Sequence, residues 1–373
     1  MRTIISELTI KNFKSIKDIK LEQCKPVNLF VGKPNTGKSN ILEAISLLSG
    51  GFNPGKKFFE GSIFYETLNN LFFNQDISQI VSVQSDVCSV QLSYFQGDKK
   101  FGCFAEATKP YDTEKFFATG KLIENLAPSE LDNIQKYTSS NEAILHFRDM
   151  NLSSYLGMNV RRNGDIEQVT NDTWFSPIRS YLYSRQHNLD SLDAPYLLPP
   201  HGNNLWGIIS RTPKLSEVVG KFFNQFNLDL IIALDDEENK IKIQKKSDGF
   251  FVHLPYSLVA DTLQRMIFHL AAIYSNNNAV ILFEEPESHT YTPYQNYLAG
   301  EIIADEQNQY FITTHSDSIF DSILREAPEK VAVFIVGYDD YQTKVRPLSD
   351  DEVRDYLNSH ASIFQNLDAY ETL

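Results

Sequence analysis

Near its N-terminus the chain reads Gly32-Lys33-Pro34-Asn35-Thr36-Gly37-Lys38-Ser39, which fits the phosphate-loop pattern G-x-x-x-x-G-K-[ST]. A short apolar run at residues 27–31 precedes this loop and predicts a buried strand. Residues 40–48 follow it, with apolar side chains at 41, 42, 45 and 48, which is helical spacing. An ordinary glycine-rich turn is the alternative, but strand, loop and helix in this order favour a nucleotide-binding loop.

The chemistry of this loop suits a nucleoside triphosphate. Successive backbone N–H groups and a helix N-terminus form a concave site for phosphate. Lys38 adds a positive charge for the β- and γ-phosphates, which also makes it a candidate catalytic residue, and the Ser39 hydroxyl can ligate Mg²⁺. We therefore expect ATP as the ligand and Mg²⁺ as its metal ion, with contacts from Gly32, Asn35, Thr36, Gly37, Lys38 and Ser39.

A second strong pattern lies at residues 279–287, which read Ala-Val-Ile-Leu-Phe-Glu-Glu-Pro-Glu. Five apolar residues predict a strand that is buried on both faces, as parallel sheets require. Ligands bind at the C-terminal ends of such strands, where Glu284 and Glu285 follow. We expect Glu284 to hold Mg²⁺ and Glu285, on the other side of the strand, to act on the attacking water. A surface turn after a core strand is the alternative, and the phosphate loop argues against it.

A third apolar strand ends in polar residues at 310–316, which read Tyr-Phe-Ile-Thr-Thr-His-Ser. A helix predicted at 293–303 separates it from the strand before Glu284, so the two strands can be parallel neighbours. In that case His315 lies beside the γ-phosphate and is a candidate catalytic residue. A lone histidine at a strand end is otherwise a structural residue.

Length, composition and charge bound the class of protein. The 373 residues are 42% hydrophobic and 22% charged, which is typical of a globular protein, and no apolar run is long enough for a membrane span. The N-terminus carries no signal-peptide pattern, and Cys24, Cys88 and Cys103 form no C-x-x-C pair, so we expect a cytoplasmic protein with structural thiols and no membrane partner. The net charge of −14 disfavours DNA as a partner, and lysines 11, 14, 17 and 20 are interpreted mainly as solvated strand positions.

The rest of the chain divides into three predicted parts: an ATPase lobe at 1–108, an inserted, partly helical subdomain at 109–172, and a second lobe at 173–373. Strands are predicted at 4–10, 16–21 and 27–31, then in 79–106 around a hairpin turn at 96–99, and at 228–234, 240–245 and 331–336. Helices are predicted near 63–71 and at 215–226 and 262–274, with a last helix capped by Asp350. Residues 172–205 are interpreted as a long packed connection.

Several motifs together resemble the AAA-type ATPases of the OLD, RecF and SMC-like branch of ABC ATPases. The motifs are Phe13-Lys14-Ser15, the phosphate loop through Asn40, Phe283-Glu284-Glu285-Pro286-Glu287 and Thr313-Thr314-His315-Ser316, with similar stretches at 199–205 and 261–265. The resemblance spans roughly 1–105 and 173–373. It implies an α/β fold, an ABC-type P-loop NTPase head with a mixed sheet, N-terminal antiparallel strands and an inserted subdomain. It also implies that Lys14 and Asn40 contact the nucleotide.

In this branch two heads dimerise around two ATP molecules, and a signature helix of one subunit caps the γ-phosphate bound to the other. The resemblance therefore implies self-association, as a head-to-head dimer or a higher oligomer. The expected Ser-x-Gly of the signature turn is Ala260-Asp261-Thr262 in this chain. Alanine cannot hydrogen-bond the phosphate and threonine cannot match the close approach of glycine, so a slow or absent turnover is an open alternative.

Too few residues follow His315 for the Toprim nuclease domain of OLD proteins. We therefore expect a stand-alone ATPase, and the resemblance to stand-alone members of this family implies the ATPase component of a prokaryotic anti-phage or toxin–antitoxin type system, acting on a separately encoded effector such as a nuclease. Two alternatives stay open. The first is a RecF-like DNA repair ATPase, and the second is an ATP-gated scaffold with negligible turnover.

Overall fold

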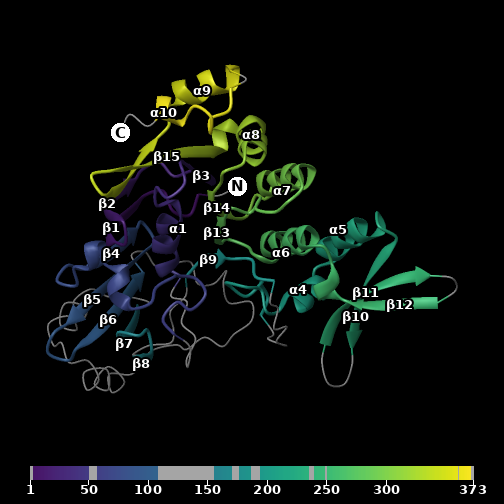
Figure 1. Cartoon of the computed structure of the whole chain (residues 1–373), viewed down its shortest axis with the longest axis horizontal. Helices are drawn as coiled ribbons and strands as arrows, with labels where there is room; N and C mark the ends of the chain where they lie inside the picture. Colours follow the sequence, from purple (N-terminus) through teal and green to yellow (C-terminus); the bar gives the residue numbers. More distant parts are fainter. Residues whose placement is uncertain are drawn as a thin grey trace.

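The computed structural model describes residues 3–49, 57–107, 155–169, 176–185, 194–234, 239–247, 250–359 and 361–370 (Figure 1). Within these ranges a central six-stranded sheet has the order β16-β15-β3-β14-β13-β9. All its neighbours are parallel except β15 and β16, which form an antiparallel edge. The strands are β3 (Val27–Val31), β9 (Ile178–Tyr181), β13 (Val280–Glu284), β14 (Gln309–Thr313), β15 (Val331–Asp339) and β16 (Gln342–Pro347).

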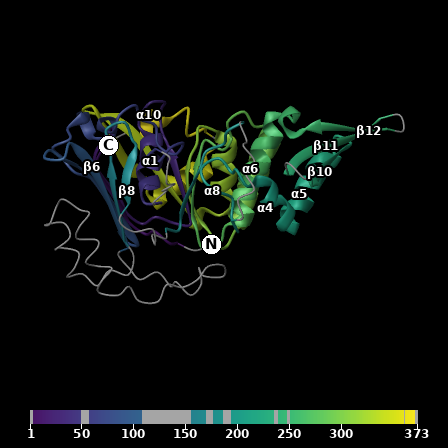
Figure 2. The same ribbon diagram turned by 90° about the horizontal axis from the view of Figure 1, so that it is seen from below.

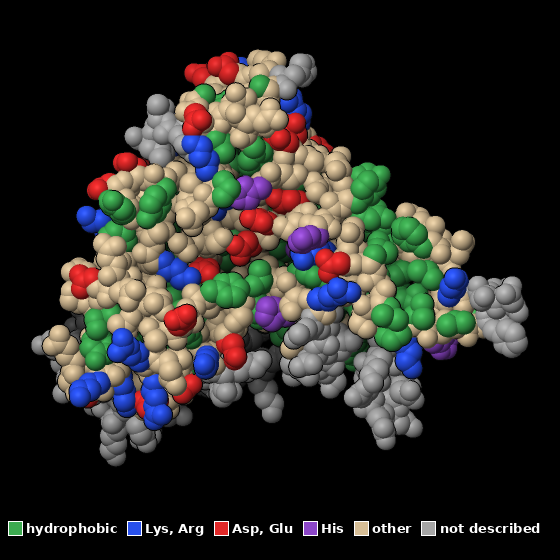
Figure 3. Space-filling view, viewed as in Figure 1, with side chains coloured by type: hydrophobic (Ala, Val, Ile, Leu, Met, Phe, Trp, Pro, Cys, Tyr) green, Lys and Arg blue, Asp and Glu red, His purple; other side chains and the backbone are tan. Residues whose placement is uncertain are grey.

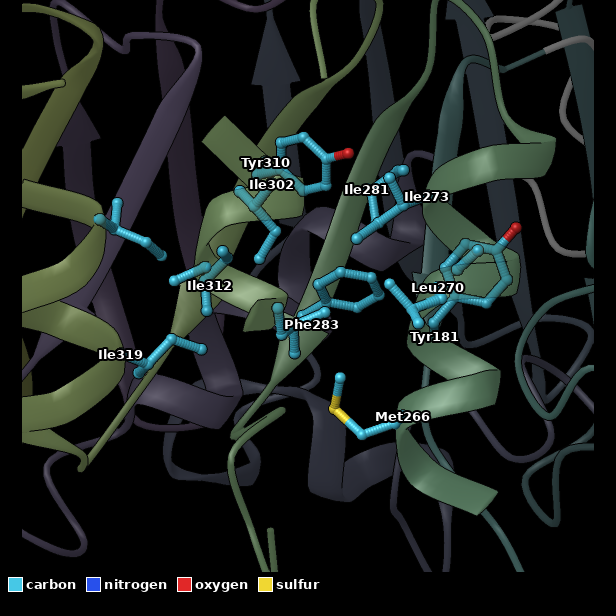
Figure 4. Close-up of a cluster of buried hydrophobic side chains, with 14 of the residues drawn as sticks. Tyr181, Met266, Leu270, Ile273, Ile281, Phe283, Ile302, Tyr310, Ile312 and Ile319 are labelled. Carbon is cyan, nitrogen blue, oxygen red and sulfur yellow. The ribbon is translucent and has the colours of Figure 1, made fainter. Parts of the chain in front are cut away.

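The apolar runs of this sheet are buried on both faces because alternate side chains enter two separate cores. On β13, Ile281 and Phe283 enter one core, and Val280 and Leu282 enter the other. Helices α6 (Asp261–Ser275), α7 (Thr292–Ala304) and α8 (Asp317–Glu326) cover the first face. Figure 4 shows Phe283 on β13 directed toward α6, where Met266 and Leu270 meet it.

Helix α1 (Lys38–Leu47) covers the other face and lies between this sheet and a second one. The second sheet is antiparallel, with seven described strands in the order β2-β1-β4-β5-β6-β7-β8. Its strands are β1 (Leu8–Phe13), β2 (Ile16–Leu21), β4 (Val81–Ser85), β5 (Cys88–Phe95), β6 (Lys100–Ala107), β7 (Tyr155–Val160) and β8 (Ile166–Val169). The predicted mixed α/β architecture with N-terminal antiparallel strands is therefore confirmed.

The predicted insertion at 109–172 needs one correction at its C-terminal side. Strand β7 pairs with β6 from Phe101 opposite Val160 to Glu106 opposite Tyr155, and β8 extends the same sheet. Residues 155–169 thus belong to the antiparallel sheet, since β6 needs a partner for its free edge. The remainder of the predicted insertion, 109–154 and 170–172, lies outside the described residues.

A third unit lies beside α6, on the side away from the antiparallel sheet of the first lobe (Figures 1 and 2). It contains α4 (Leu205–Arg211), α5 (Pro213–Asn224) and a three-stranded antiparallel sheet of β10 (Leu228–Leu234), β11 (Asn239–Ser247) and β12 (Phe250–Pro255). The sequence predicts α5, β10 and β11 but misses α4 and β12. It also misses β9, because its short run lies among prolines that favour an irregular connection.

Other local predictions shift by a few residues. Strand β1 begins at Leu8 rather than at residue 4, because the backbone N–H groups of Ile4 and Ile5 donate to the Gln309 side chain instead of to a strand. The helix predicted near 63–71 is only a 3₁₀ turn at Leu68–Leu71. The last long helix, α9 (Asp350–Asn358), is capped by Ser349 rather than by Asp350, because Ser349 and Glu352 form a capping box.

The three cysteines are free and buried, as expected of structural thiols, and burial raises the pKa of Cys103 to about 12. Among the residues that the structure describes, no helix has the length and apolar character needed to cross a membrane.

Candidate functional site

The glycine loop joins β3 to α1. At two of its positions, Gly37 and Gly32, there is no room for a side chain. Gly37 has φ of 96° and caps α1, and a Cβ atom there would lie 2.0 Å from Thr343 Oγ1. At Gly32 a Cβ atom would lie 2.1 Å from the carbonyl oxygen of Val336. Strands β15 and β16 therefore press against the loop from outside, which leaves its N–H groups and the N-terminus of α1 as a cradle for an anion.

Lys38 lies buried across this cradle. Its Nζ donates to the carbonyl oxygen of Gly32 at 2.9 Å and to that of Lys33 at 2.7 Å. Burial lowers the pKa of Lys38 to about 8, although the nearby Glu285 carboxylate acts in the opposite direction. The amine is thus hydrogen-bonded to two neutral backbone carbonyls. A phosphate bound in the loop could replace these carbonyls as its partner.

The outer side of the loop is fastened by a chain of short polar contacts. Thr343 Oγ1 donates to the carbonyl oxygen of Thr36 at 2.9 Å and lies 2.6 Å from Ser15 Oγ. Asn40 Nδ2 donates to the same Ser15 oxygen at 2.7 Å. Sequence reasoning misses Thr343, which no motif marks. The contacts of Asn40 and Thr36 with a nucleotide remain predictions, since both groups here hold the loop.

Lys14 occupies the turn between β1 and β2 at φ of 49°. Its amine forms an ion pair with the buried Glu43 of α1 and donates to the carbonyl oxygen of Phe64 at 2.8 Å. Burial raises the pKa of Glu43 while Lys14 opposes the shift. The structure therefore assigns Lys14 a partner on α1, and its contact with a nucleotide remains a prediction.

The predicted carboxylates and histidine come together because β13 and β14 are parallel neighbours in register, with Glu284 opposite Thr313. Glu285 follows at φ of 42°, where its N–H donates to the Thr313 carbonyl at 3.0 Å. Its carboxylate lies 3.4 Å from Nε2 of His315 and accepts from Ser288 Oγ at 3.1 Å. The pKa of His315 is lowered by burial and then by the charge of Lys38, so the imidazole is neutral at pH 7.

The predicted metal ligands are of the type that Mg²⁺ prefers. Ser39 lies in the first turn of α1, and Glu284 is the last residue of β13 and is half-buried. A hydroxyl and a carboxylate are hard oxygen donors, and both sit at the edge of the sheet that carries the phosphate cradle. The donor set therefore fits Mg²⁺.

A cavity of about 240 Å³ adjoins the two carboxylates, and sequence reasoning missed its far wall. It is lined by Leu182, Tyr183, Arg265, His269, Glu284, Glu285 and Ser288. Arg265 pairs with Asp261 at 2.7 Å and stacks 4.4 Å from the centre of the Tyr183 ring, while the Tyr183 hydroxyl donates to Asp261. Figure 3 shows the face of the molecule that is turned to the viewer in Figure 1. Acidic and histidine side chains gather in the hollow at the middle of this face.

The signature-like turn begins α6. Ala260 is the exposed N-cap residue and forms no side-chain cap. Thr262 Oγ1 donates to the carbonyl oxygen of His289 at 3.0 Å, which ties this helix to the loop that follows Glu285.

Comparison with known proteins identifies the family of the chain. The family described as "AAA domain, putative AbiEii toxin, Type IV TA system" matches residues 123–321, just over half of the chain, and the AAA ATPase domain family matches 4–173. An ATP/GTP phosphatase of Helicobacter pylori is 23% identical over 402 residues, which cover 97% of this chain and 100% of the relative. The RecF protein of Thermoanaerobacter sp. (strain X514) is 30% identical over 99 residues, 26% of this chain and 25% of RecF.

The structure also aligns with two solved structures. An SMC head bound to the C-terminal winged-helix domain of ScpA aligns with 95% of this chain and 100% of its own, at 14% identity and a TM-score of 0.48. The SMC head domain of Thermotoga maritima aligns with 94% and 100% respectively, at 13% identity and a TM-score of 0.39. The phosphate loop, the carboxylates and the histidine meet at one sheet edge, and the AAA-domain family model matches more than half of the chain, so the chain belongs to this family of AAA-domain ATPases.

Proposed function

We propose that this ATPase binds Mg-ATP in the glycine cradle and hydrolyses it with Glu285 and His315. The observation that carries the proposal is the 3.4 Å contact between Glu285 and His315, beside a buried Lys38 whose charge acts on both. A base, a neutral hydrogen-bonding imidazole and a cation around one anion cradle are the groups that phosphoryl transfer to water requires.

In this proposal Lys38 leaves the two loop carbonyls when ATP enters and places its charge on the β- and γ-phosphates. Glu285 orients the attacking water and takes its proton. The water oxygen bonds to the γ-phosphorus while the bond from that phosphorus to the bridging oxygen breaks, which yields ADP and phosphate. His315 donates from its neutral ring to the γ-phosphate. Mg²⁺, held by Ser39 and Glu284, would neutralise phosphate charge when bound.

The assembly that we propose is a head-to-head pair of subunits. The exposed N-terminus of α6, at Ala260, would face the ATP of the second subunit. Its side chains cannot supply the serine hydroxyl of the usual signature, so its free N–H groups would carry this contact. We expect slow turnover as a result.

The biological role that we propose is that of the ATPase component of an anti-phage or toxin–antitoxin type system, which controls a separate effector such as a nuclease. The printed description of the matching family, which names a putative toxin of a type IV toxin–antitoxin system, supports this proposal. ATP turnover by the purified chain, with Mg²⁺ and with a chelator, tests the enzymatic part. Phage plating on cells that carry the chain and its neighbouring gene, with Lys38→Ala as the control, tests the biological part.

Similarity to RecF over about a quarter of the chain favours a second candidate, a DNA repair ATPase. A steep fall of duplex binding with salt, in the presence of ATP, would support it. The net charge of −14 counts against it. If the chain binds ATP but neither hydrolyses it nor binds DNA, the scaffold alternative replaces both.

A further inference from the structure

A buried glutamate that has no role in the proposed hydrolysis lies two residues beyond Glu285. Glu287 is only 7% exposed. Its Oε1 accepts two hydrogen bonds of 2.8 Å, from Thr314 Oγ1 and from the backbone N–H of His315. The loop after β13 is thereby joined to the residues that follow β14.

These two bonds occur where the sheet no longer supplies partners. Strand β14 ends at Thr313 and α8 begins at Asp317, so the His315 N–H lies between two regular elements. Glu287 satisfies this N–H and leaves its own Oε2 without a hydrogen-bond partner in the described structure. Burial raises the pKa of Glu287, while its hydrogen bonds to His315 and Thr314 act in the opposite direction.

The imidazole of His315 has two further neighbours. Its Nε2 faces Glu285 at 3.4 Å, and its ring lies 6.4 Å from the ring of Phe364, centre to centre. Gln295 of α7 braces the same region, since it accepts from Ser316 and donates to the Thr290 carbonyl. His315 thus contacts Glu285 and Phe364 through its side chain, and Glu287 through its backbone N–H.

We propose that Glu287 is a positioning residue for hydrolysis, which holds the His315 main chain so that the imidazole stays against Glu285 and the γ-phosphate. The proposal rests on the function proposed above for His315. In this proposal the role of residue 287 requires a hydrogen-bond acceptor at the place of Oε1. It does not require a negative charge.

The test combines Glu287→Ala and Glu287→Gln with His315→Ala in a double-mutant cycle of ATP turnover. Glu287→Ala is expected to lower kcat about 10-fold or more, while the KM for ATP changes less than about threefold, because misplacement of a catalytic group affects the chemical step. Glu287→Gln retains most of kcat, since its amide oxygen accepts the same two bonds. In the His315→Ala background, Glu287→Ala changes kcat by less than about twofold.

Asp305→Ala is the matched control. Asp305 is a partly buried carboxylate that accepts from Asn308 and Tyr310, but it lies before β14, at the opposite end of that strand from His315. Its loss should lower thermal stability without changing kcat. If Glu287→Ala does not fold, Thr314→Val removes one of the two bonds and is expected to give a smaller loss of kcat.

A second measurement does not depend on turnover. In selectively labelled, nucleotide-free protein, the magnetic contact between the rings of His315 and Phe364 is expected to be lost in Glu287→Ala and kept in Glu287→Gln. An inactive parent protein that shows this pattern would refute the proposed hydrolysis but not the positioning role. A ring contact unchanged in Glu287→Ala, or an equal loss of kcat with and without His315, would overturn the positioning role.

Discussion

Two residues of the site, Lys38 and Glu285, carry the chemistry that we propose, and their surroundings favour it. The amine of Lys38 donates to two backbone carbonyls, and its burial lowers its pKa to about 8. Glu285 is half-buried between His315 and Ser288. The arrival of phosphate would therefore change the protonation of Lys38.

The lysine gives the first prediction. ATP phosphates favour the charged amine, so the Lys38 pKa rises on binding and the protein takes up on the order of half a proton at pH 8. Calorimetry in two buffers of different ionisation enthalpy measures this uptake, which declines toward pH 7, where the amine is already charged.

Lys38→Ala is expected to abolish ATP binding in the same experiment. Lys33→Ala is the matched control, because it removes the same charge from the same loop. The Lys33 side chain lies in a partly exposed ion pair with Asp368 instead of in the cradle. Unchanged ATP affinity in Lys38→Ala would show that the cradle is not the nucleotide site.

The second prediction separates the two adjacent carboxylates. Glu285→Gln removes the base and is expected to lower hydrolysis about 10²-fold or more while ATP binding survives or tightens. Glu284→Gln removes a metal ligand and is expected to weaken nucleotide binding and its Mg²⁺ dependence together. Turnover and calorimetry with varied Mg²⁺ distinguish them. Should Glu284→Gln be the variant that traps ATP, the two roles are reversed.

At the scale of elements, the glycine loop depends on strands that lie far away in the sequence. A third prediction follows for Gly37→Ala, whose Cβ would lie 2.0 Å from Thr343 Oγ1 at φ of 96°. We expect a loss of at least about 2 kcal/mol in the free energy of unfolding, together with loss of ATP binding.

Chemical denaturation measures this effect, and Gly220→Ala is the control. Gly220 lies inside α5, and a Cβ atom added there would enter open space, so alanine should stabilise by about 0.5–1 kcal/mol. Equal stability of the two variants would mean that the contact with Thr343 relaxes at no cost.

The N-terminus of α6 gives the fourth prediction. Ala260→Ser together with Thr262→Gly should raise turnover if this helix meets the ATP of a second subunit, because the serine hydroxyl and the close glycine backbone are restored. Thr262 also donates to His289, so Ala260→Ser alone is the control that keeps this tie. A folded double variant with unchanged or lower turnover would place residues 260–262 away from the second ATP.

For the whole molecule, the fifth prediction concerns assembly. Glu285→Gln with Mg-ATP should persist as a dimer, with about twice the mass of the 42.6 kDa chain in light scattering. In the proposed assembly, ATP held between two heads would close the interface until it is hydrolysed, so a variant that binds but does not cleave ATP would accumulate the closed form. Lys38→Ala under the same conditions should remain a monomer, and a Glu285→Gln monomer would refute the head-to-head assembly.

The site was predictable from sequence wherever its residues follow local rules. The phosphate loop, Glu284, Glu285 and His315 each adjoin a strong apolar strand, and parallel strands place their C-terminal ends at one edge. The helices α5 and α6 were predictable from periodicity alone. Short elements without such periodicity, such as β9 and β12, were not.

What only the tertiary structure decides are contacts between segments distant in sequence. Thr343 closes the glycine loop from more than 300 residues away, Arg265 and Tyr183 wall the cavity beside the carboxylates, and Glu287 anchors His315. Thr343 and Tyr183 lie in none of the sequence motifs, and although Arg265 and Glu287 do, no spacing in the chain indicates which groups they contact, because sheet order and burial choose those partners. The sequence determined the chemistry at the strand ends, because local backbone geometry creates it, and the packing of the sheet and helices determined how that chemistry is held.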